Sequence, residues 1–357
     1  MDDPADRARR LAQELANEAQ ALIRQNRLDA AEARLTEALR LDPVAVRLHD
    51  IGTVRLLAGQ PQAAELRFRE ALAVSDQPQL RASLGLSLLA QGRLAEGFAQ
   101  YDAWRAIPDS RSGPAPALGA PLWSGEDLAG KNVLVLGEEG LGDQIMYARF
   151  APLLRAAGAE VIWACAPPLQ RLVREGLGIP AVSGAGRLQA TGVDFVAPTS
   201  RLPVVFMQRR AEPPPAPYLT PPPPNRAAGV RIGVVARGNP RHENDHNRSL
   251  SDAAAAELLA LPGATSLAPE LTGARDFWDT AGVIMGLDLV ITVDTSTAHL
   301  AGALGRPVWL LLPAIGCDWR WGVSGETSRW YPSMRLFRQT AAGDWSGVLA
   351  RVKAELG

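Results

Sequence analysis

The chain has very few lysines, no long apolar run and almost no net charge. Its lysines are Lys131 and Lys353, so arginine must supply nearly every cation. A net charge of −1 and a pI of about 6.5 give no bulk electrostatic attraction to nucleic acid or to an anionic membrane. We therefore expect no nucleic-acid partner.

Cysteine is also scarce. Cys165 and Cys317 have neither metal-binding nor redox spacing, which suits a reducing compartment. Residues 1–7 lack the apolar core of a signal peptide, and no apolar stretch approaches membrane-spanning length. These features predict a cytoplasmic protein without a transmembrane segment.

The first third of the chain is an internal repeat. Asn26, Gly59 and Gly92 recur at intervals of 33 residues, close to the period of tetratricopeptide repeats. The same interval separates Ala31, Ala64 and Gly97, and likewise Leu35, Phe68 and Tyr101. We predict three helix pairs between residues 8 and 107, which either hold a peptide or protein in a groove or serve as a spacer.

A glycine-rich turn between a strand and a helix is the first candidate ligand contact. Residues 133–136 predict a strand, and residues 144–157 predict an amphipathic helix. The glycines between Gly137 and Asp143 leave space for a ligand beside the Asp143 carboxylate. The alternative is that Asp143 is an acid favoured by the helix dipole.

A second turn of this type follows the apolar strand 289–293. Ser296 or Thr297 is expected to cap the following helix, and Gly305 is expected to end it. Backbone N–H groups, hydroxyls and the positive end of a helix then converge on one point, which suits a diphosphate. The alternative is an ordinary strand-to-helix turn of an α/β sheet.

Three separated stretches resemble a known family. Residues 140–154 resemble the first turn and helix of heptosyltransferase-like glycosyltransferases, and residues 293–308 resemble their donor-phosphate turn. The Trp-rich residues 319–338 resemble a subgroup of bacterial proteins in which this domain follows tetratricopeptide repeats. The resemblance implies the GT-B fold, in which two Rossmann-like α/β halves enclose the active site.

The expected architecture is therefore α + α/β in three parts. Residues 1–112 form the repeat domain, and a linker rich in Pro and Gly spans residues 108–121. Residues 113–225 form the acceptor-side half, which ends in the proline-rich connector 212–224. Residues 226–357 form the nucleotide-sugar donor half.

The resemblance also implies roles for individual residues. Asp143 would be the general base, beside acceptor-side Gly140, Gly142 and Gln144. The residues expected to bind the donor are Asn239, Arg241, Arg248, Asp294, Thr295, Ser296, Thr297 and His299.

One segment matches a different motif. His242 to His246 fits the zinc-protease pattern H-E-x-x-H, which requires both histidines on one face of a helix. Pro240 precedes the segment, and Asn244 and Asp245 are poor helix formers, so a loop is expected instead. Arginines in such a loop suit the phosphates of a nucleotide sugar, and we expect no metal here.

We therefore expect an inverting glycosyltransferase that needs no cofactor besides its nucleotide-sugar donor substrate. The sequence has no Asp-x-Asp motif to hold a divalent metal, so metal independence is expected. The repeats are expected to recruit a protein acceptor. Two alternatives stay open: a non-catalytic scaffold with a degenerate transferase domain, and a transferase that acts on lipid or polysaccharide.

Overall fold

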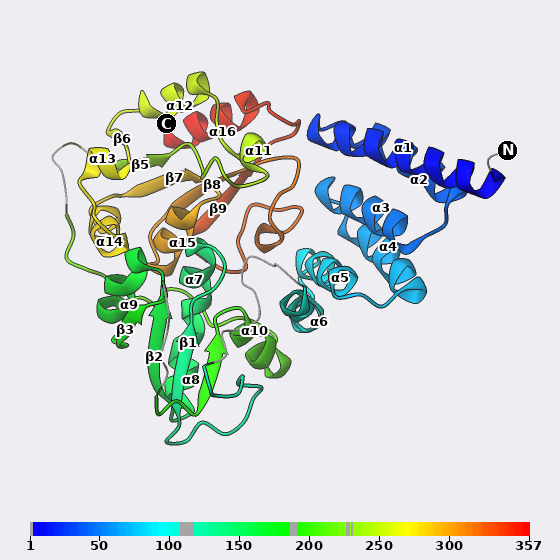
Figure 1. The fold of residues 1–357 in the computed structure, drawn as a ribbon. Helices are drawn as coiled ribbons and strands as arrows, with labels where there is room; N and C mark the ends of the chain where they lie inside the picture. The colour runs from blue at the N-terminus through cyan, green and yellow to red at the C-terminus, as the bar shows by residue number, and fades with distance from the viewer. Residues whose placement is uncertain (1–2, 108–117, 186–190, 226–228, 230) are drawn as a thin grey trace. The chain divides into compact units, whose positions relative to one another are not determined.

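The computed structural model describes residues 3–107, 118–185, 191–225, 229 and 231–357 (Figure 1). The chain divides into two compact units. Unit 1 comprises Met1–Ser110, Pro313–Ser324 and Ala341–Gly343, and unit 2 comprises Arg111–Leu312, Gly325–Thr340 and Asp344–Gly357. Most of the predicted linker 108–121, including the expected boundary after residue 112, lies outside the described residues. Among the residues described, no helix is both long and apolar enough to cross a membrane.

The helices of unit 1 form sequential pairs, as the repeat predicted. They are α1 (Pro4–Arg24), α2 (Leu28–Leu41), α3 (Ala45–Leu57), α4 (Pro61–Val74), α5 (Pro78–Ala90) and α6 (Leu94–Tyr101). The 3-10 helix η1 (Asp102–Ala106) follows α6. The first helix begins before residue 8, because the Asp3 side chain accepts a hydrogen bond from the Ala5 N–H and caps it.

The 33-residue interval has a direct structural cause. Asn26, Gly59 and Gly92 each lie in the turn that follows the first helix of a pair, in the left-handed region with φ of 59°, 71° and 76°. Small residues lie where the paired helices touch: a side chain at Gly97 would place its Cβ 2.7 Å from Leu89 Cγ. Ala64 is fully buried at the equivalent position. The 33-residue interval therefore reflects two structural requirements of each helix pair: one left-handed turn and one close helix contact.

Unit 2 contains two parallel sheets. The first has the strand order β3-β2-β1-β4, and the second has the order β6-β5-β7-β8-β9. The strands are β1 (Asn132–Leu136), β2 (Glu160–Cys165), β3 (Ala181–Ser183), β4 (Phe195–Pro198), β5 (Ile232–Val235), β6 (Ala264–Ser266), β7 (Leu289–Val293), β8 (Val308–Leu312) and β9 (Met334–Arg338). This confirms the predicted fold class of helical repeats followed by a GT-B-like pair of Rossmann-like halves.

Short helices connect these strands, and a last helix follows β9. They are α7 (Leu141–Tyr147), α8 (Ala151–Ala156), α9 (Gln170–Leu177), α10 (Arg201–Phe206), α11 (Asp245–Arg248), α12 (Asp252–Leu259), α13 (Pro269–Thr272), α14 (Phe277–Met285), α15 (Ser296–Ala303) and α16 (Ser346–Leu356). The single helix predicted over 144–157 was wrong, because the 3-10 helix η2 (Ala148–Phe150) separates α7 from α8. Pro152 has no N–H to donate to Ala148, and its ring disfavours a continuous helix there.

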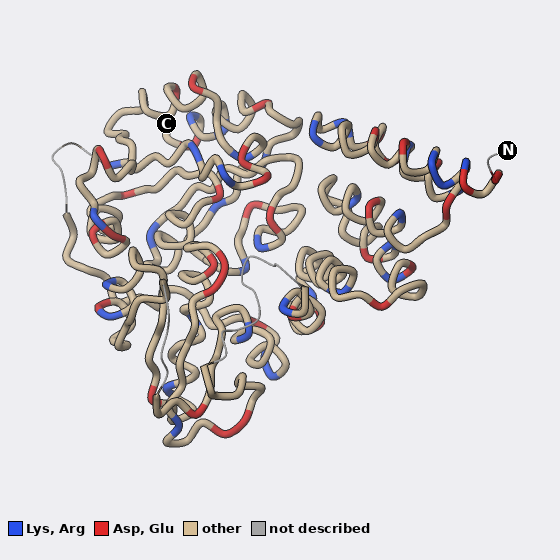
Figure 2. Tube along the Cα trace, viewed as in Figure 1, with Lys and Arg blue, Asp and Glu red and all other residues tan. Residues whose placement is uncertain are grey.

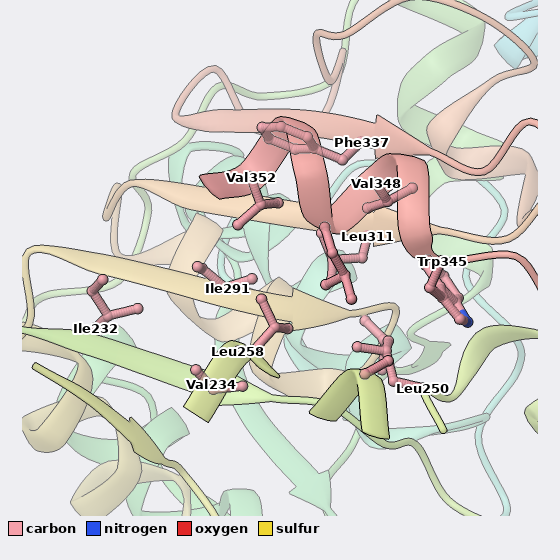
Figure 3. Packing of buried hydrophobic residues seen from close by; sticks show 13 residues of the cluster. Ile232, Val234, Leu250, Leu258, Ile291, Leu311, Phe337, Trp345, Val348 and Val352 are labelled. Atoms are coloured by element: carbon pink, nitrogen blue, oxygen red, sulfur yellow. The ribbon is translucent and has the colours of Figure 1, made fainter. Parts of the chain in front are cut away.

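The second sheet has a well-defined core on one face (Figure 3). Apolar side chains of β5, β7, β8 and β9 meet those of α12 and α16. They include Val234, Ile291, Leu311, Leu258 and Val352, each no more than 2% exposed. Charged residues of both signs are interspersed along both units (Figure 2), in keeping with the small net charge.

The proline-rich connector is bound to both halves of unit 2. The Tyr218 N–H donates to the Ala303 carbonyl of α15 at 3.1 Å. The Thr220 N–H donates to Gly176 of α9 at 2.8 Å. These bonds hold the connector against the two halves, so it is an integral part of unit 2.

Candidate active site

The two predicted motifs meet in unit 2, where α7 packs against α15 (Figure 1). Each helix follows the end of a parallel strand, β1 for α7 and β7 for α15. A side chain at Gly142 would place its Cβ 2.8 Å from His299 Cδ2 and 3.4 Å from Ser296 Cα. The absence of a side chain at Gly142 therefore permits this close approach. Gly142, Ser296 and His299 come from both predicted motifs and lie at one place.

The Asp143 carboxylate has a structural contact at the start of α7. Gly140 is the N-cap residue, and its N–H donates to Asp143 Oδ2 at 2.8 Å. This bond satisfies an amide at the helix start, and the carboxylate lies at the positive end of the helix dipole. Asp143 is partly buried. The helix-start interpretation of Asp143 thus describes a real contact, and its role as a base stays a prediction.

Gln144 lies next to Asp143 but is buried. Its Oε1 accepts a hydrogen bond from the Ala166 N–H at 3.3 Å, just beyond β2. A side chain at Gly137 would place its Cβ 2.4 Å from the same oxygen. Gln144 therefore connects the first turns of α7 to the end of β2, and a direct role toward an acceptor stays a prediction.

The start of α15 is capped differently from the prediction. Thr295, and not Ser296 or Thr297, is the N-cap residue, and it makes no side-chain capping hydrogen bond. The Thr295 hydroxyl instead lies 3.2 Å from the Thr292 hydroxyl at the end of β7. Asp294 to Thr297 are all partly exposed. The first turn of α15 thus presents amides and hydroxyls at the positive end of a helix, a suitable environment for an anion.

Arg248 connects a third predicted segment to this turn. Its Nη1 donates to the Asp294 carbonyl at 3.0 Å, and its Nε donates to Asp245 Oδ1 at 3.0 Å. The Arg248 side chain is 13% exposed. Asn239 and Arg241 are exposed on the same segment, where Asn239 Oδ1 accepts from the Arg241 N–H. Of these three predicted residues, the structure brings Arg248 to the Asp294 turn.

The zinc-protease pattern is not placed on one continuous helix. His242 precedes α11, and His246 lies within this single helical turn. Two histidines four residues apart share a helix face only when the helix spans both. Among the residues described, no group of three or more His, Cys, Asp or Glu is arranged to hold a metal ion.

Two tyrosine hydroxyls connect the His299 ring to the backbone of α7. His299 is buried, and its Nδ1 lies 2.9 Å from the Tyr331 hydroxyl. The Tyr331 hydroxyl lies 3.4 Å from that of Tyr218, which donates to the Ile145 carbonyl at 2.8 Å. Burial and the neighbouring Tyr331 raise the pKa of Tyr218 well above its usual value, so Tyr218 stays neutral. These hydroxyl contacts fix the orientation of the His299 ring.

Arg149 binds the same aromatic residues. Its guanidinium carbon lies 5.0 Å from the ring centres of Tyr218 and Trp330 and 4.8 Å from that of Tyr331. Its Nη1 donates to the carbonyls of Pro214 and Trp330 at 3.1 and 3.0 Å. Arg149 is 1% exposed, so a buried cation joins the first half, the connector and the second half.

Sequence reasoning assigned no site role to Arg149, Tyr218 or Tyr331. Tyr331 lies in the Trp-rich stretch 319–338, which carried part of the family resemblance. Tyr218 is the one aromatic residue of the proline-rich connector 212–224, and this could have indicated a packing or hydrogen-bonding role. Nothing local in the sequence distinguishes Arg149 from the exposed arginines.

The fold and the site define a class of protein. Tetratricopeptide-like helical repeats precede a GT-B-like pair of Rossmann-like halves, and the facing helix starts of the two halves form the candidate site. No family model matches the chain.

One curated protein is similar to most of the chain. The chain is 26% identical, over an alignment of 379 residues, to Protein FlbA of Caulobacter vibrioides. The alignment covers 90% of this chain and 63% of FlbA, so the chain spans less than two thirds of that relative.

Two solved structures are also similar. A tetratricopeptide-repeat protein of Thermus thermophilus is 34% identical, with 24% of this chain and 45% of that chain covered and a TM-score of 0.22. TibC of E. coli, an iron-containing dodecameric glycosyltransferase, is 14% identical, with 62% and 66% covered and a TM-score of 0.42.

Proposed function

We propose that this protein is a glycosyltransferase that moves a sugar from a nucleotide-sugar donor to an acceptor hydroxyl. The packing of α7 against α15 at Gly142 and His299 is the observation that carries the proposal. It joins a helix start that bears a carboxylate to a helix start that bears hydroxyls and open amides. The resemblance of both motifs to heptosyltransferase-like enzymes supports the same reaction.

In this proposal the donor diphosphate lies at the first turn of α15. The amides and hydroxyls of Thr295, Ser296 and Thr297 would bind its oxygens, assisted by the helix dipole. Arg248, held against the Asp294 carbonyl, would supply a cation in a half whose lone lysine is Lys353. Asn239 and Arg241 remain proposed contacts on the exposed segment.

The proposed transfer inverts the anomeric carbon. Asp143 takes the proton of the acceptor hydroxyl, whose oxygen forms a bond to the anomeric carbon. The bond from that carbon to the diphosphate breaks, and its electron pair leaves with the phosphate. His299 and the start of α15 stabilise the charge that develops there. We propose metal independence because the sequence has no Asp-x-Asp motif, and no cofactor beyond the donor.

The repeats complete the proposal by recruiting a protein acceptor, and the reaction would take place in the cytoplasm. One observation favours a second candidate, a non-catalytic scaffold: the Asp143 carboxylate already serves as a helix-capping group. Transfer to a lipid or polysaccharide is the third outcome that acceptor assays would reveal.

A nucleoside diphosphate is expected to bind equally well with and without EDTA. The helix start and Arg248 provide the binding groups, so metal removal changes nothing in them. Calorimetry with a panel of nucleoside diphosphates gives the affinity, and thermal shifts provide a second readout. A ligand at 100 times its Kd adds about 2.7 kcal/mol of stability. Loss of binding in EDTA would refute the metal-independent proposal.

Tyr331→Phe is expected to lower kcat/KM by roughly five- to tenfold, because one hydrogen bond to His299 Nδ1 is lost. Nucleotide affinity should stay close to the wild-type value, because the proposed donor contacts at the start of α15 do not include Tyr331. A parallel loss of nucleotide affinity and of kcat/KM would indicate a purely structural role for Tyr331. Tyr101→Phe in α6 is the matched control and should behave as wild type.

Removal of residues 1–112 is expected to raise the apparent KM for the protein acceptor and to leave donor hydrolysis in place. Recruitment raises effective concentration, by about 100-fold or more, without changing the chemistry. Transfer of labelled sugar by the full and shortened chains measures this, with donor hydrolysis as the control. Equal transfer by both chains would reduce the repeats to a structural cap.

A further inference from the structure

Unit 1 contains a segment from the C-terminal third of the sequence. Residues Pro313–Ser324 follow β8, yet they belong to the same compact unit as the repeat helices. We call Pro313–Ser324 the anchor segment. It contains the 3-10 helix η5 (Trp319–Trp321).

The anchor segment touches the repeat unit at two separate places. Ile315 packs against an apolar cluster from α1, α2 and α3, and the Gly316 N–H donates to the Leu57 carbonyl at 2.9 Å. Trp319 meets Phe98 of α6 edge to face, with ring centres 5.6 Å apart. Phe98 is fully buried. The anchor segment therefore contributes to the packed interior of the repeat unit.

The anchor segment is also fixed by its own side chains. Asp318 caps η5 by accepting from the Arg320 N–H at 2.9 Å, and it forms an ion pair with the Arg320 side chain at 2.8 Å. The Arg320 guanidinium lies 4.6 Å from the centre of the Trp319 ring. A segment held in this way loses little conformational freedom when it binds.

The anchor segment follows directly after strand β8 of unit 2 in the sequence. In the second sheet Val293 of β7 is aligned with Leu311 of β8. The turn at Asp294 and the start of the anchor segment at Pro313 thus leave the same edge of adjacent parallel strands. Residues Pro313–Ser324, which follow β8 directly, are therefore the ones that pack with the repeat helices.

We infer that the anchor segment is an internal docking element, through which the repeat array binds the C-terminal half non-covalently and independently of the covalent linker. This inference does not depend on the proposed reaction. Ile315 and Trp319 are the two apolar contacts that carry it, and the Gly316 N–H fixes the register between them.

The test is a full-length chain with a protease recognition sequence inserted between residues 112 and 113. After cleavage, confirmed on a denaturing gel, gel filtration at about 1 µM should still give one complex, which corresponds to a Kd below about 1 µM. Trp319→Ala should weaken the association by about 30-fold, since truncation of an aromatic side chain packed against a buried partner typically has that effect. Ile315→Ser should also weaken it. In a dilution series, the cleaved Trp319→Ala variant should therefore separate into two species at a concentration about 30-fold higher than the cleaved wild type does.

Val323→Ala is the matched control, because Val323 lies in the same segment and is 47% exposed. Its cleaved form should stay together like the wild type. Circular dichroism of each uncleaved variant tests whether the repeats remain folded. Separation of the cleaved wild type at about 1 µM would overturn the inference, and so would a cleaved Trp319→Ala variant that stays together as the wild type does.

Cys317 gives a second readout in the uncleaved chain. The other cysteine, Cys165, is buried, and burial raises the pKa of its thiol to about 11, so it should react slowly with alkylating reagents. Labelling therefore reports mainly on Cys317 within the anchor segment. Trp319→Ala should speed this labelling at least about fivefold if the anchor segment is released more often. An unchanged rate would contradict the docking role even where a variant is hard to cleave.

Discussion

Asp143→Asn is expected to lower sugar transfer by about 100- to 10,000-fold and to leave donor affinity within about twofold of the wild type. The asparagine oxygen can still accept the Gly140 N–H bond that caps α7. It cannot take a proton from an acceptor hydroxyl. The substitution therefore separates the two roles of Asp143, because it preserves the cap and removes the base. Transfer assays and calorimetry with the same nucleotide sugar measure the two effects.

Asp29→Asn provides the matched control, since Asp29 is an exposed acid in the first turn of α2. Both substitutions remove a charge from a helix start, which is worth about 0.3–1 kcal/mol of stability. Only the Asp143 variant should lose transfer. Wild-type turnover in Asp143→Asn would exclude this residue as the base and favour the capping role alone. Absence of transfer and donor binding in the wild type as well would favour the scaffold.

Arg149→Lys is expected to destabilise unit 2 by about 2–4 kcal/mol, although it keeps the charge. The guanidinium fork bonds the carbonyls of Met146, Pro214 and Trp330 at once. A lysine ammonium cannot reproduce this planar geometry, and it would leave buried carbonyls unpaired. For a unit of this size the thermal transition should fall by roughly 5–15 °C.

Arg155→Lys is the control for this measurement, because Arg155 belongs to the neighbouring helix α8 and is exposed. It donates to the Leu177 carbonyl at 3.2 Å, where water can replace it. Its variant should melt within about 1–2 °C of the wild type. Equal transitions for both variants would show that the aromatic residues, and not Arg149, hold the connector in place.

Several elements followed directly from local sequence. The left-handed turn residues Asn26, Gly59 and Gly92 predicted the helix pairs, because their φ values depend on residue type and immediate neighbours. The strands β1 and β7 were predicted correctly from their apolar runs. The break at η2 was missed, although Pro152 signals it, because the apolar periodicity continues across the proline.

The helix cap showed the limit of local reasoning. Hydroxyl residues at 295, 296 and 297 all suit an N-cap, and residue type alone cannot choose among them. The backbone at the end of β7 decides for Thr295, whose hydroxyl then faces Thr292. The backbone conformation at the end of β7 thus determines which residue caps α15, and it leaves the first turn of α15 without a side-chain cap.

What the sequence determined by itself was periodicity, turn type and the residue chemistry of each motif, since these depend on neighbours along the chain. Only the tertiary structure decided that Gly142 meets His299, that Arg149 lies among Tyr218, Trp330 and Tyr331, and that residues 313–324 pack with the repeats. Each of these contacts joins residues far apart in the sequence. Their formation depends on the burial of shared apolar surface in three dimensions, which no local pattern encodes.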